Sequence, residues 1–582
     1  MSTKVDVARN VRIPMRDGVE LVADIFRPRT PDRVPTILTR TAYGKSGLMA
    51  LMGQYKRLAA EGYAVVVQDK RGIHASAGDY SILRDDSAGE HQDGYDTVEW
   101  IANQEWSDGQ VVAYGLSYLG HTTMGAAVAA PPHLTAAMSI QPSTDEYTDR
   151  TFVDGVLSLE NIVSWATLPF VARALIAARR ETERSELRRE LATFRKTPDV
   201  YSTLPLESMP FMRKFPLLWP DVLAHREDRD FFAENQISGA EAACISVPIA
   251  HVGGWFDFFI RNTVRQYELV KNATGARQLL VVGPWRHGAF TAGKASGVAF
   301  PDSVVDTNQL LLEWVAAQTG RTSQDPGPAA IIYVLGDNRW RAEESWPIAG
   351  IQQMPYYLTA DGGLAIEAAT EGTRAFDYDP ADPYRGKSAI AGLPTLDEAH
   401  AHPGLLVYRS QPLAEALEIT GWPRAELTAR TSSTDVDWVV ELSVVDTNGV
   451  SRLLTEGITR ARYRHGREHP QPVSPGTDEN YSIDLRPISI ILQPGERLEV
   501  SVTGGKFPTY ERNPGKFIAL NTFTADDLTV SHNEVVSGVN GSKVVLPIVP
   551  QGAGGRWIAN PWPGTRAWRL TTAAITRAML PS

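Results

Sequence analysis

The amino-acid sequence predicts a protein of the α/β class that continues into a β-rich C-terminal domain. Short apolar runs alternate with helical patterns in the first part of the chain, as in "GYAVVVQDKRG" (62–72) followed by "GYDTVEWIANQ" (94–104). This alternation is typical of a parallel sheet covered by helices. After about residue 350 the pattern changes to alternating and β-branched runs separated by Asn-Gly, Pro-Gly and Gly-Ser turns, which indicates several strands of a β-sandwich or jelly roll.

The α/β part begins with a predicted hairpin. In "VRIPMRDGVELVADIFRP" two alternating runs flank a turn at Arg16, Asp17 and Gly18. Apolar runs predict the strands that follow, which are "VPTILTRTAYGK", 62–72, 110–114, 134–143, 245–255 and 277–285.

A helical insertion interrupts this alternation. Residues 145–240 contain no strand run of the same type, and "VARALIAARRETERSELRRELATFRK" (171–196) is a long helical stretch that is apolar first and charged after. Such a charged run is usually a solvated helix face. The predicted domains are an α/β core in two parts, a helical cap inserted between them, and a β-sandwich, with the boundaries 1–144, 145–240, 241–350 and 351–582.

Length and composition limit the classes of protein to which the chain can belong. The 582 residues suffice for two or three domains, and 43% hydrophobic and 21% charged residues are typical of a soluble globular protein. The net charge of −11 argues against a nucleic-acid partner. The sequence shows no signal-like start and no apolar run of the roughly 18 to 20 residues that a membrane span needs, so we expect a cytoplasmic protein without a membrane partner. The single cysteine, Cys244, excludes an intrachain disulfide, and its apolar surroundings predict a buried structural thiol.

Ser117 lies on a predicted turn between a strand and a helix, in "VVAYGLSYLG" (111–120). Such a turn directs its side chain outward and places the N–H of Tyr118 at a helix N-terminus, where it can donate to an oxyanion. Gly115 and Gly120 supply the small residues that a close approach of strand and helix needs. The second glycine is displaced by one position from the usual Gly-x-Ser-x-Gly motif, so Ser117 is either a nucleophile or part of a packing turn.

Two later residues have the order and placement of a catalytic acid and base. Asp257 follows the strand run "PIAHVGGW", and His287 follows "LLVVG" through "PWRHG". Catalytic groups collect at the carboxyl ends of parallel strands, and a serine nucleophile needs a base that a third group orients. These placements favour a Ser117–Asp257–His287 triad.

One tyrosine and four histidines are further candidates for a functional role. Tyr43, at the end of "TRTAYGK", is either a second oxyanion donor or a half-buried aromatic at a strand end. His74, in "RGIHASAGDY", could line the site, although we expect it in a structural loop, and we expect His251 in the core. His465 and His469, in "RYRHGREHP", are expected in a solvated loop and not at a metal.

Several stretches together resemble one known family. They are "IPMRDGVELVADIFRP", "TAYGK", "GYAVVVQDKRG", "YGLSYLG", "GGWFDFF", "GPWRHG" and "GGKFPTYERNPG". Their order is similar to that of the bacterial cocaine esterase family, from near residue 10 to about 515. The wider family includes X-prolyl dipeptidyl peptidases and α-amino-acid ester hydrolases, so the resemblance does not define the substrate.

The resemblance implies an α/β-hydrolase core, an inserted helical cap and a C-terminal jelly roll. It implies Ser117 as nucleophile, His287 as base and Asp257 as orienting acid, with the Tyr43 hydroxyl and the Tyr118 N–H as oxyanion hole. The displaced glycine is the family's own form of the elbow. The substrate pocket would be lined by Phe152, Trp165, Leu168, Phe258 and Phe259. Phe258 stands where the family's namesake has a glycine, which implies a narrower pocket.

The function expected from these features is a serine carboxylic-ester hydrolase that forms an acyl-enzyme on Ser117. Its substrates would be small-molecule esters with neutral, hydrophobic or aromatic acyl groups, and no cofactor or metal is needed. An exposed sandwich edge would suit a homodimer.

Two alternatives stay open. An α-amino-acid ester hydrolase or X-prolyl dipeptidyl peptidase would use the same triad but needs unpaired carboxylates for the substrate ammonium. The residues after Asp257 are apolar, whereas Glu146, Asp149 or Asp154 could supply such a site. The other alternative is a non-catalytic scaffold or carbohydrate-binding protein, with Trp562 in "NPWPG" as a platform.

Overall fold

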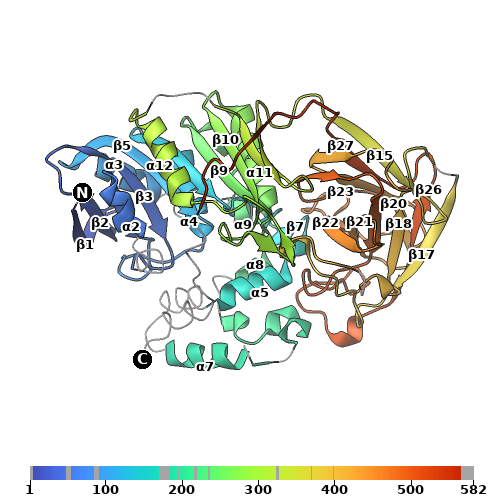
Figure 1. Ribbon diagram of the computed structural model, residues 1–582. Coiled ribbons are helices and arrows are strands. Elements are labelled where there is room, and N and C mark those ends of the chain that lie inside the picture. Colours follow the sequence, from blue (N-terminus) through green and yellow to red (C-terminus); the bar gives the residue numbers. More distant parts are fainter. Residues whose placement is uncertain are drawn as a thin grey trace.

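A computed structural model (Figure 1) describes most of the chain. The described residues are 4–46, 54–83, 91–168, 184–194, 196–197, 199–214, 219–233, 236–322, 327–368, 370–396 and 399–564. In this view the helical insertion lies below the central sheet, and the C-terminal strands form a separate β-rich unit on the right.

The N-terminal domain is built on one long twisted sheet. Its strands in spatial order are β1 (Val5–Pro14), β2 (Glu20–Pro28), β4 (Ala64–Asp69), β3 (Val34–Thr41), β5 (Ser107–Leu116), β6 (Leu134–Ile140), β9 (Ile249–Phe256), β10 (Gln278–Arg286), β13 (Ala330–Val334), β14 (Arg339–Glu343) and β28 (Arg556–Ile558). Neighbours from β4 to β13 are parallel, whereas β1, β2, β14 and β28 pair antiparallel at the two edges. The predicted hairpin is confirmed as the pair β1 and β2.

Helices cover both faces of this sheet. Successive side chains of a strand point to opposite faces, and the central strands carry apolar side chains on both. In β4, Val65 and Val67 belong to one core together with Leu58, whereas Val66 belongs to another core with Ile101. The first core includes helices α2 (Gln54–Ala60) and α12 (Thr307–Gln318), and the second includes α3 (Asp93–Ala102) and α4 (Tyr118–Val128). Helix α11 (Ile260–Ala273) follows β9 and contacts both β9 and β10. These layers confirm the predicted α/β class.

The insertion leaves the sheet after β6 and returns before β9. Its two ends meet, because the N–H of Ile237 donates to the carbonyl of Thr144 at 3.1 Å. Its elements are the hairpin β7 (Phe152–Val153) and β8 (Val156–Leu157), then α5 (Leu159–Thr167), α7 (Arg184–Phe194), α8 (Pro220–Ala224), α9 (Arg229–Phe232) and, at its end, α10 (Gly239–Ala243). Helix α7 lies within the helical stretch predicted at 171–196, whose residues 171–183 are outside the described residues.

The C-terminal unit consists of two antiparallel sheets. One contains β15 (Gln352–Leu358), β16 (Leu364–Ala365), β17 (Gly372–Tyr378), β19 (Leu417–Gly421), β20 (Arg424–Thr431), β23 (Glu479–Asp484), β24 (Ile488–Leu492), β26 (Ser531–Ser537) and β27 (Lys543–Ile548). The other contains β18 (Leu405–Arg409), β21 (Asp437–Val445), β22 (Ser451–Arg460) and β25 (Arg497–Thr503). A β-rich C-terminal domain is therefore confirmed, and the specific jelly-roll topology stays a prediction.

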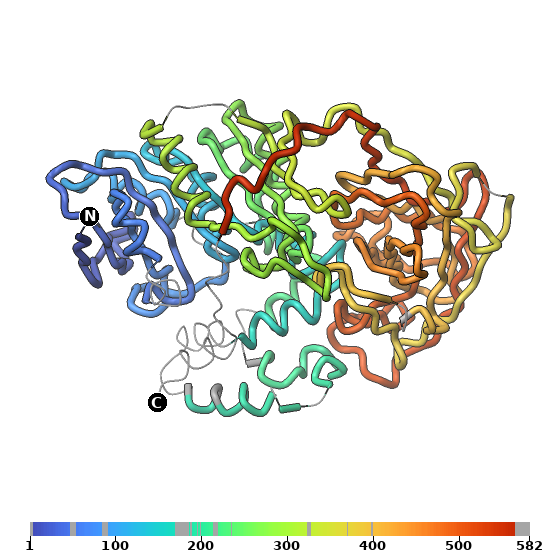
Figure 2. Tube along the Cα trace, viewed as in Figure 1, coloured from blue at the N-terminus to red at the C-terminus, as the bar shows by residue number. Residues whose placement is uncertain are grey.

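The end of the described chain returns to the N-terminal domain, which the predicted boundary at residue 351 did not foresee. Figure 2 shows this segment in red, running from the C-terminal unit back over the sheet domain, where β28 pairs with β14. Trp562 follows β28, is 5% exposed, and donates its indole N–H to Glu313 at 2.8 Å. The carbohydrate platform suggested for Trp562 is therefore wrong, because the ring is buried.

Two further sequence predictions concern single features. Cys244 is exposed, so the prediction of a buried thiol is wrong. It follows the last residue of the short helix α10, where the apolar neighbour Ile245 points inward and the thiol does not. Within the described residues, no helix is long and apolar enough to cross a bilayer.

Candidate active site

Ser117 occupies a strained turn between β5 and α4. Its φ of 62° and ψ of −122° are values that a residue with a side chain rarely adopts, and such strain gathers at functional sites. The turn is held from both sides, since the Ser117 N–H donates to the carbonyl of Ile140 at 2.8 Å and the His121 N–H donates to the carbonyl of Ser117 at 3.0 Å. The Ser117 side chain lines a cavity instead of the protein core.

The two glycines of this turn explain the displaced motif. A Cβ atom on Gly115 would lie 2.0 Å from the carbonyl oxygen of Leu119, which is an impossible contact. A Cβ atom on Gly120 would lie 3.0 Å from the carbonyl oxygen of Ile140, where α4 approaches β6. The close approach of helix and strand thus requires a small residue at position 120, whereas Leu119 lines the cavity.

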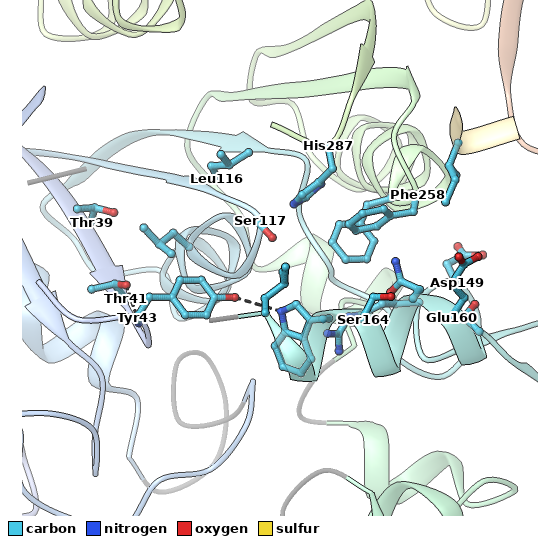
Figure 3. Close-up of a pocket in the computed structure, with 18 of the residues that line it drawn as sticks. Thr39, Thr41, Tyr43, Leu116, Ser117, Asp149, Glu160, Ser164, Phe258 and His287 are labelled. Carbon is cyan, nitrogen blue, oxygen red and sulfur yellow. Dashed lines mark hydrogen bonds between the residues drawn. The ribbon is translucent and has the colours of Figure 1, made fainter. Parts of the chain in front are cut away.

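Asp257 and His287 meet at the carboxyl ends of two neighbouring parallel strands. Asp257 follows β9, and His287 follows β10. Their side chains are joined by a hydrogen bond of 2.8 Å between His287 Nδ1 and Asp257 Oδ1. Asp257 is fully buried, whereas the His287 side chain is 23% exposed. Figure 3 shows His287 and Ser117 at the same cavity.

Gln141, which sequence analysis did not single out, holds the loop of His287. Its side-chain oxygen accepts from the N–H of Gly288 at 2.7 Å, and its amide nitrogen donates to the carbonyl of Arg286 at 3.4 Å. Gln141 is fully buried and follows the end of β6. The residues on both sides of His287 are therefore tied to a third strand of the sheet.

Tyr43 presents its hydroxyl to the cavity from the loop that follows β3 (Figure 3). The indole Nε1 of Trp165 donates to this hydroxyl at 3.3 Å. Burial raises the pKa of Tyr43 to about 12, with smaller opposite effects of Trp165 and Arg150. The phenol is therefore neutral at physiological pH and keeps its proton for donation.

The cavity has a volume of about 740 Å³ and lies where core, insertion and C-terminal unit meet. Trp165, Leu168, Phe258 and Phe259 line it, as the family resemblance implied. Phe258 stacks on the imidazole of His287 with a centroid distance of 4.3 Å, so its ring covers one face of that side chain.

Phe152 does not belong to this lining, and its predicted place in the pocket is wrong. The Phe152 side chain is fully buried and packs edge-on against Phe232. Arg467 lies 4.0 Å and Arg226 lies 5.5 Å from its ring centroid, so cations and not substrate cover its faces. Its chain neighbour Val153 contacts the cavity instead.

Comparisons with known proteins agree with this geometry. Residues 17–289 match the family model of the X-Pro dipeptidyl-peptidase (S15 family), and residues 322–526 match that of the X-Pro dipeptidyl-peptidase C-terminal non-catalytic domain. The cocaine esterase of a Rhodococcus species is 30% identical over 574 residues, which are 93% of this chain and 98% of that protein. The chain belongs to the cocaine esterase family. It is a serine hydrolase of the esterase type that this family contains.

Solved structures of related enzymes have the same fold. An α-amino acid ester hydrolase matches with a TM-score of 0.79 at 25% identity, covering 94% of this chain and 97% of that structure. An aminopeptidase from a marine-sediment Thaumarchaeota archaeon matches with a TM-score of 0.77 at 25% identity and the same coverage. The proteins similar to this chain thus include enzymes that are named for different substrates. The substrate class of this chain therefore has to be argued from the residues that line its own pocket.

The three acidic residues considered for an ammonium site are all paired with arginines. Asp149 accepts from Arg261 and from Arg265 at 2.7 Å each. Asp154 accepts from Arg261 at 2.9 Å. Glu146 accepts from Arg150 at 2.5 Å.

Sequence analysis missed several lining residues of this family member. Lys45 and Asp69 form a buried ion pair of 3.4 Å beside Tyr43, and burial raises the pKa of Asp69. Asp69 ends β4, so its place at the carboxyl edge of the sheet was a usable signal. Arg486 and Tyr510 enter from the C-terminal unit, and no local pattern indicated them.

The remaining histidines have the following places. His251 is buried and shares a hydrogen bond of 2.8 Å with Gln278, as expected of a core histidine. His74 lies in a loop and is exposed, and it lines the cavity, which was the alternative considered for it. His465 and His469 are exposed, as expected, and the described residues contain no cluster suited to a metal ion.

Proposed function

We propose that the protein hydrolyses carboxylic esters through an acyl-enzyme on Ser117, and that it prefers neutral, hydrophobic or aromatic groups next to the scissile carbonyl. The observation that supports this proposal most strongly is the shared cavity, which contains the strained Ser117, the His287 of the His287–Asp257 pair, and the Tyr43 hydroxyl. A nucleophile, an oriented base and an oxyanion donor are the groups that acyl transfer requires.

In this mechanism His287 takes the proton of Ser117 as the hydroxyl attacks the ester carbonyl. Asp257 accepts a hydrogen bond from the Nδ1–H of His287, which orients the ring and stabilises the imidazolium that forms. His287 then gives the proton to the leaving alkoxide, and an acyl-enzyme remains on Ser117. Water, deprotonated by His287, attacks the acyl-enzyme, and His287 then returns this proton to the oxygen of Ser117 as the carboxylic acid is released.

The oxyanion of both tetrahedral intermediates would be stabilised by Tyr43 and the N–H of Tyr118. The pKa of Tyr43 is raised to about 12, so the phenol keeps its proton throughout the neutral range. The N–H of Tyr118 lies at the first turn of α4, where backbone donors point away from the helix. Loss of one such donor typically lowers the rate by about 10² to 10³.

The walls around the nucleophile support a preference for apolar acyl groups. Phe258, Phe259 and Trp165 present aromatic surface to the cavity. About 740 Å³ is enough room for a small ester. The three carboxylates considered for an α-ammonium group, Glu146, Asp149 and Asp154, are each paired with an arginine, which disfavours the aminoacyl-ester alternative.

The experiment that tests this proposal compares initial rates for p-nitrophenyl esters from acetyl to benzoyl with those for an α-aminoacyl ester and a Gly-Pro anilide. We expect the neutral esters to be hydrolysed fastest and the Ser117→Ala variant to be inactive toward all of them. Faster turnover of the aminoacyl ester or the anilide would contradict the proposal and place the enzyme in the peptidase branch.

A further inference from the structure

One face of helix α5 forms a wall of the active-site cavity. Glu160, Asn161, Ser164 and Trp165 line the cavity, and their spacing places them on one side of the helix. Leu168, which directly follows the helix, lines the cavity as well. The opposite side is buried and apolar, with Leu159, Ile162, Val163 and Ala166 in the core of the insertion. The helix is thereby held by its apolar side, and its polar side is presented to whatever fills the cavity.

Glu160 lies at the end of the cavity that is opposite Thr39 and Thr41 (Figure 3). Its carboxylate has no hydrogen-bond or ion-pair partner among the described residues. Burial raises the pKa of Glu160, and the nearby carboxylate of Glu456 raises it further. No cation of the described residues offsets these two effects, so within that part of the chain the carboxylate has no counter-ion of the kind that a partly buried charge normally has.

The other charged groups of the cavity wall do have partners. Lys45 pairs with Asp69 at 3.4 Å, and Arg150 pairs with Glu146 at 2.5 Å. Asp149 is held by Arg261 and Arg265, as described above. Arg486 lies 4.0 Å from Glu456, whose other oxygen binds Lys506. The far end of the cavity therefore carries one negative charge that no described side chain neutralises.

This charge is remote from the reaction centre. Trp165, which bonds to the hydroxyl of Tyr43, is five residues after Glu160 on the same helix. With a rise of about 1.5 Å per residue, the two positions are about 7.5 Å apart along the helix axis. A group on the α-carbon of the acyl chain stays close to the carbonyl and does not span this distance.

We infer that Glu160 is a specificity-determining residue that binds a positively charged group carried by the ester several bonds away from its carbonyl. An ammonium group supplies the missing counter-ion, and the ring of Tyr510, which lines the same cavity from the C-terminal unit, suits the methyl groups of a quaternary ammonium. This inference rests on the proposed esterase function and adds a distal cationic group to its neutral, apolar acyl segment.

The test uses two p-nitrophenyl esters that differ only in charge. One has an acyl chain of about four to six methylene groups, long enough to span about 7.5 Å, ending in trimethylammonium. The other has the same chain ending in a tert-butyl group, which has the same shape and no charge. We expect the wild-type kcat/KM to be about tenfold higher for the cationic ester, mainly through KM, and we expect Glu160→Gln to abolish this preference while keeping the rate for the neutral ester.

The matched control is Glu207→Gln, which removes the same charge from an exposed position of the insertion and should leave the preference unchanged. Equal rates for the two esters in the wild type, or a preference that persists in Glu160→Gln, would overturn the inference. A third ester that ends in a carboxylate tests Arg150 as the recognition group, and its preference by the wild type would also overturn the inference. If the wild type hydrolyses none of the esters, the proposed function itself fails, which is a separate result.

Discussion

The indole N–H of Trp165 donates a hydrogen bond of 3.3 Å to the hydroxyl of Tyr43, and this bond joins the helical insertion to the proposed oxyanion hole. The Tyr43 oxygen accepts the hydrogen bond from Trp165 through a lone pair, so its O–H stays available to donate to the substrate. The insertion thus contributes to the geometry of catalysis as well as to the shape of the pocket. Trp165 also stacks under Arg150, whose guanidinium carbon is 4.4 Å from the ring centroid.

Replacing Trp165 by Phe should lower kcat for a neutral ester by about fivefold, because one neutral hydrogen bond is lost while the aromatic surface stays. Tyr43→Phe should cost about 10² to 10³. In the double variant the Trp165 substitution should have almost no further effect, since its partner hydroxyl is gone. A double-mutant cycle in kcat measures this coupling, and strictly multiplicative losses would show that Trp165 does not act through Tyr43.

The two glycines beside Ser117 should tolerate alanine unequally. Gly115→Ala places a methyl group 2.0 Å from a backbone oxygen and should prevent the turn from forming, with loss of activity and of stable protein. Gly120→Ala meets its nearest atom at 3.0 Å, so we expect a folded enzyme with reduced stability and measurable activity. Expression level, thermal unfolding and ester hydrolysis distinguish the variants; full activity of Gly115→Ala would show that the turn differs from the one described.

Phe258 should limit the size of the acyl group. Its ring lines the cavity and covers one face of His287, so Phe258→Gly removes a wall close to the reacting carbonyl. We expect the ratio of kcat/KM for benzoyl to acetyl esters to rise by about tenfold. If the loss of the Phe258 ring also weakens the packing around His287, both esters react more slowly, and this common effect cancels in the ratio. An unchanged ratio would mean that Phe258 supports the base and does not shape the pocket.

His251 should make the protein sensitive to mild acid. Burial lowers its pKa to about 4, and the hydrogen bond to Gln278 opposes this only in part. A histidine in the unfolded chain has a pKa of about 6.5, so the unfolded state binds more protons and stability falls as the pH drops below that value. Between pH 7 and pH 5 the loss is about 2 kcal/mol for this side chain. Urea unfolding of the wild type and of His251→Gln at the two pH values measures it, and an equal decrease in both proteins would contradict the assignment.

The sequence predicted those features that depend on short-range patterns and on sheet geometry. Asp257 and His287 were placed together because both follow buried runs, and parallel neighbours bring their carboxyl ends to one edge. Ser117 was placed by the local strand–turn–helix pattern. The apolar run at 62–72 predicted a strand that is buried on both faces. In the structure Val65 and Val67 pack into one core and Val66 into the other, which explains why the run is continuously apolar.

Features that depend on distant parts of the chain could not be predicted in this way. Arg486 and Tyr510 reach the cavity from the C-terminal unit, more than 300 residues after Ser117 in the sequence, and nothing near them marks this role. Phe152 was placed in the pocket by the family resemblance, but the short hairpin turns its ring inward. The place of Glu160 on the unburied side of its helix could have been predicted. The spacing of polar and apolar residues in 159–167 already separates that side from the buried one.

The most direct test of the account is the site of covalent labelling by a fluorophosphonate, which reacts with an activated serine. After labelling of the intact protein and digestion, mass spectrometry should find the phosphonyl group on the peptide that contains Ser117. The Ser117→Ala protein should remain unlabelled, and His287→Ala should react far more slowly, because the serine has lost its base. Labelling of another residue, or equal labelling of the wild type and Ser117→Ala, would contradict the assignment of Ser117 as the nucleophile.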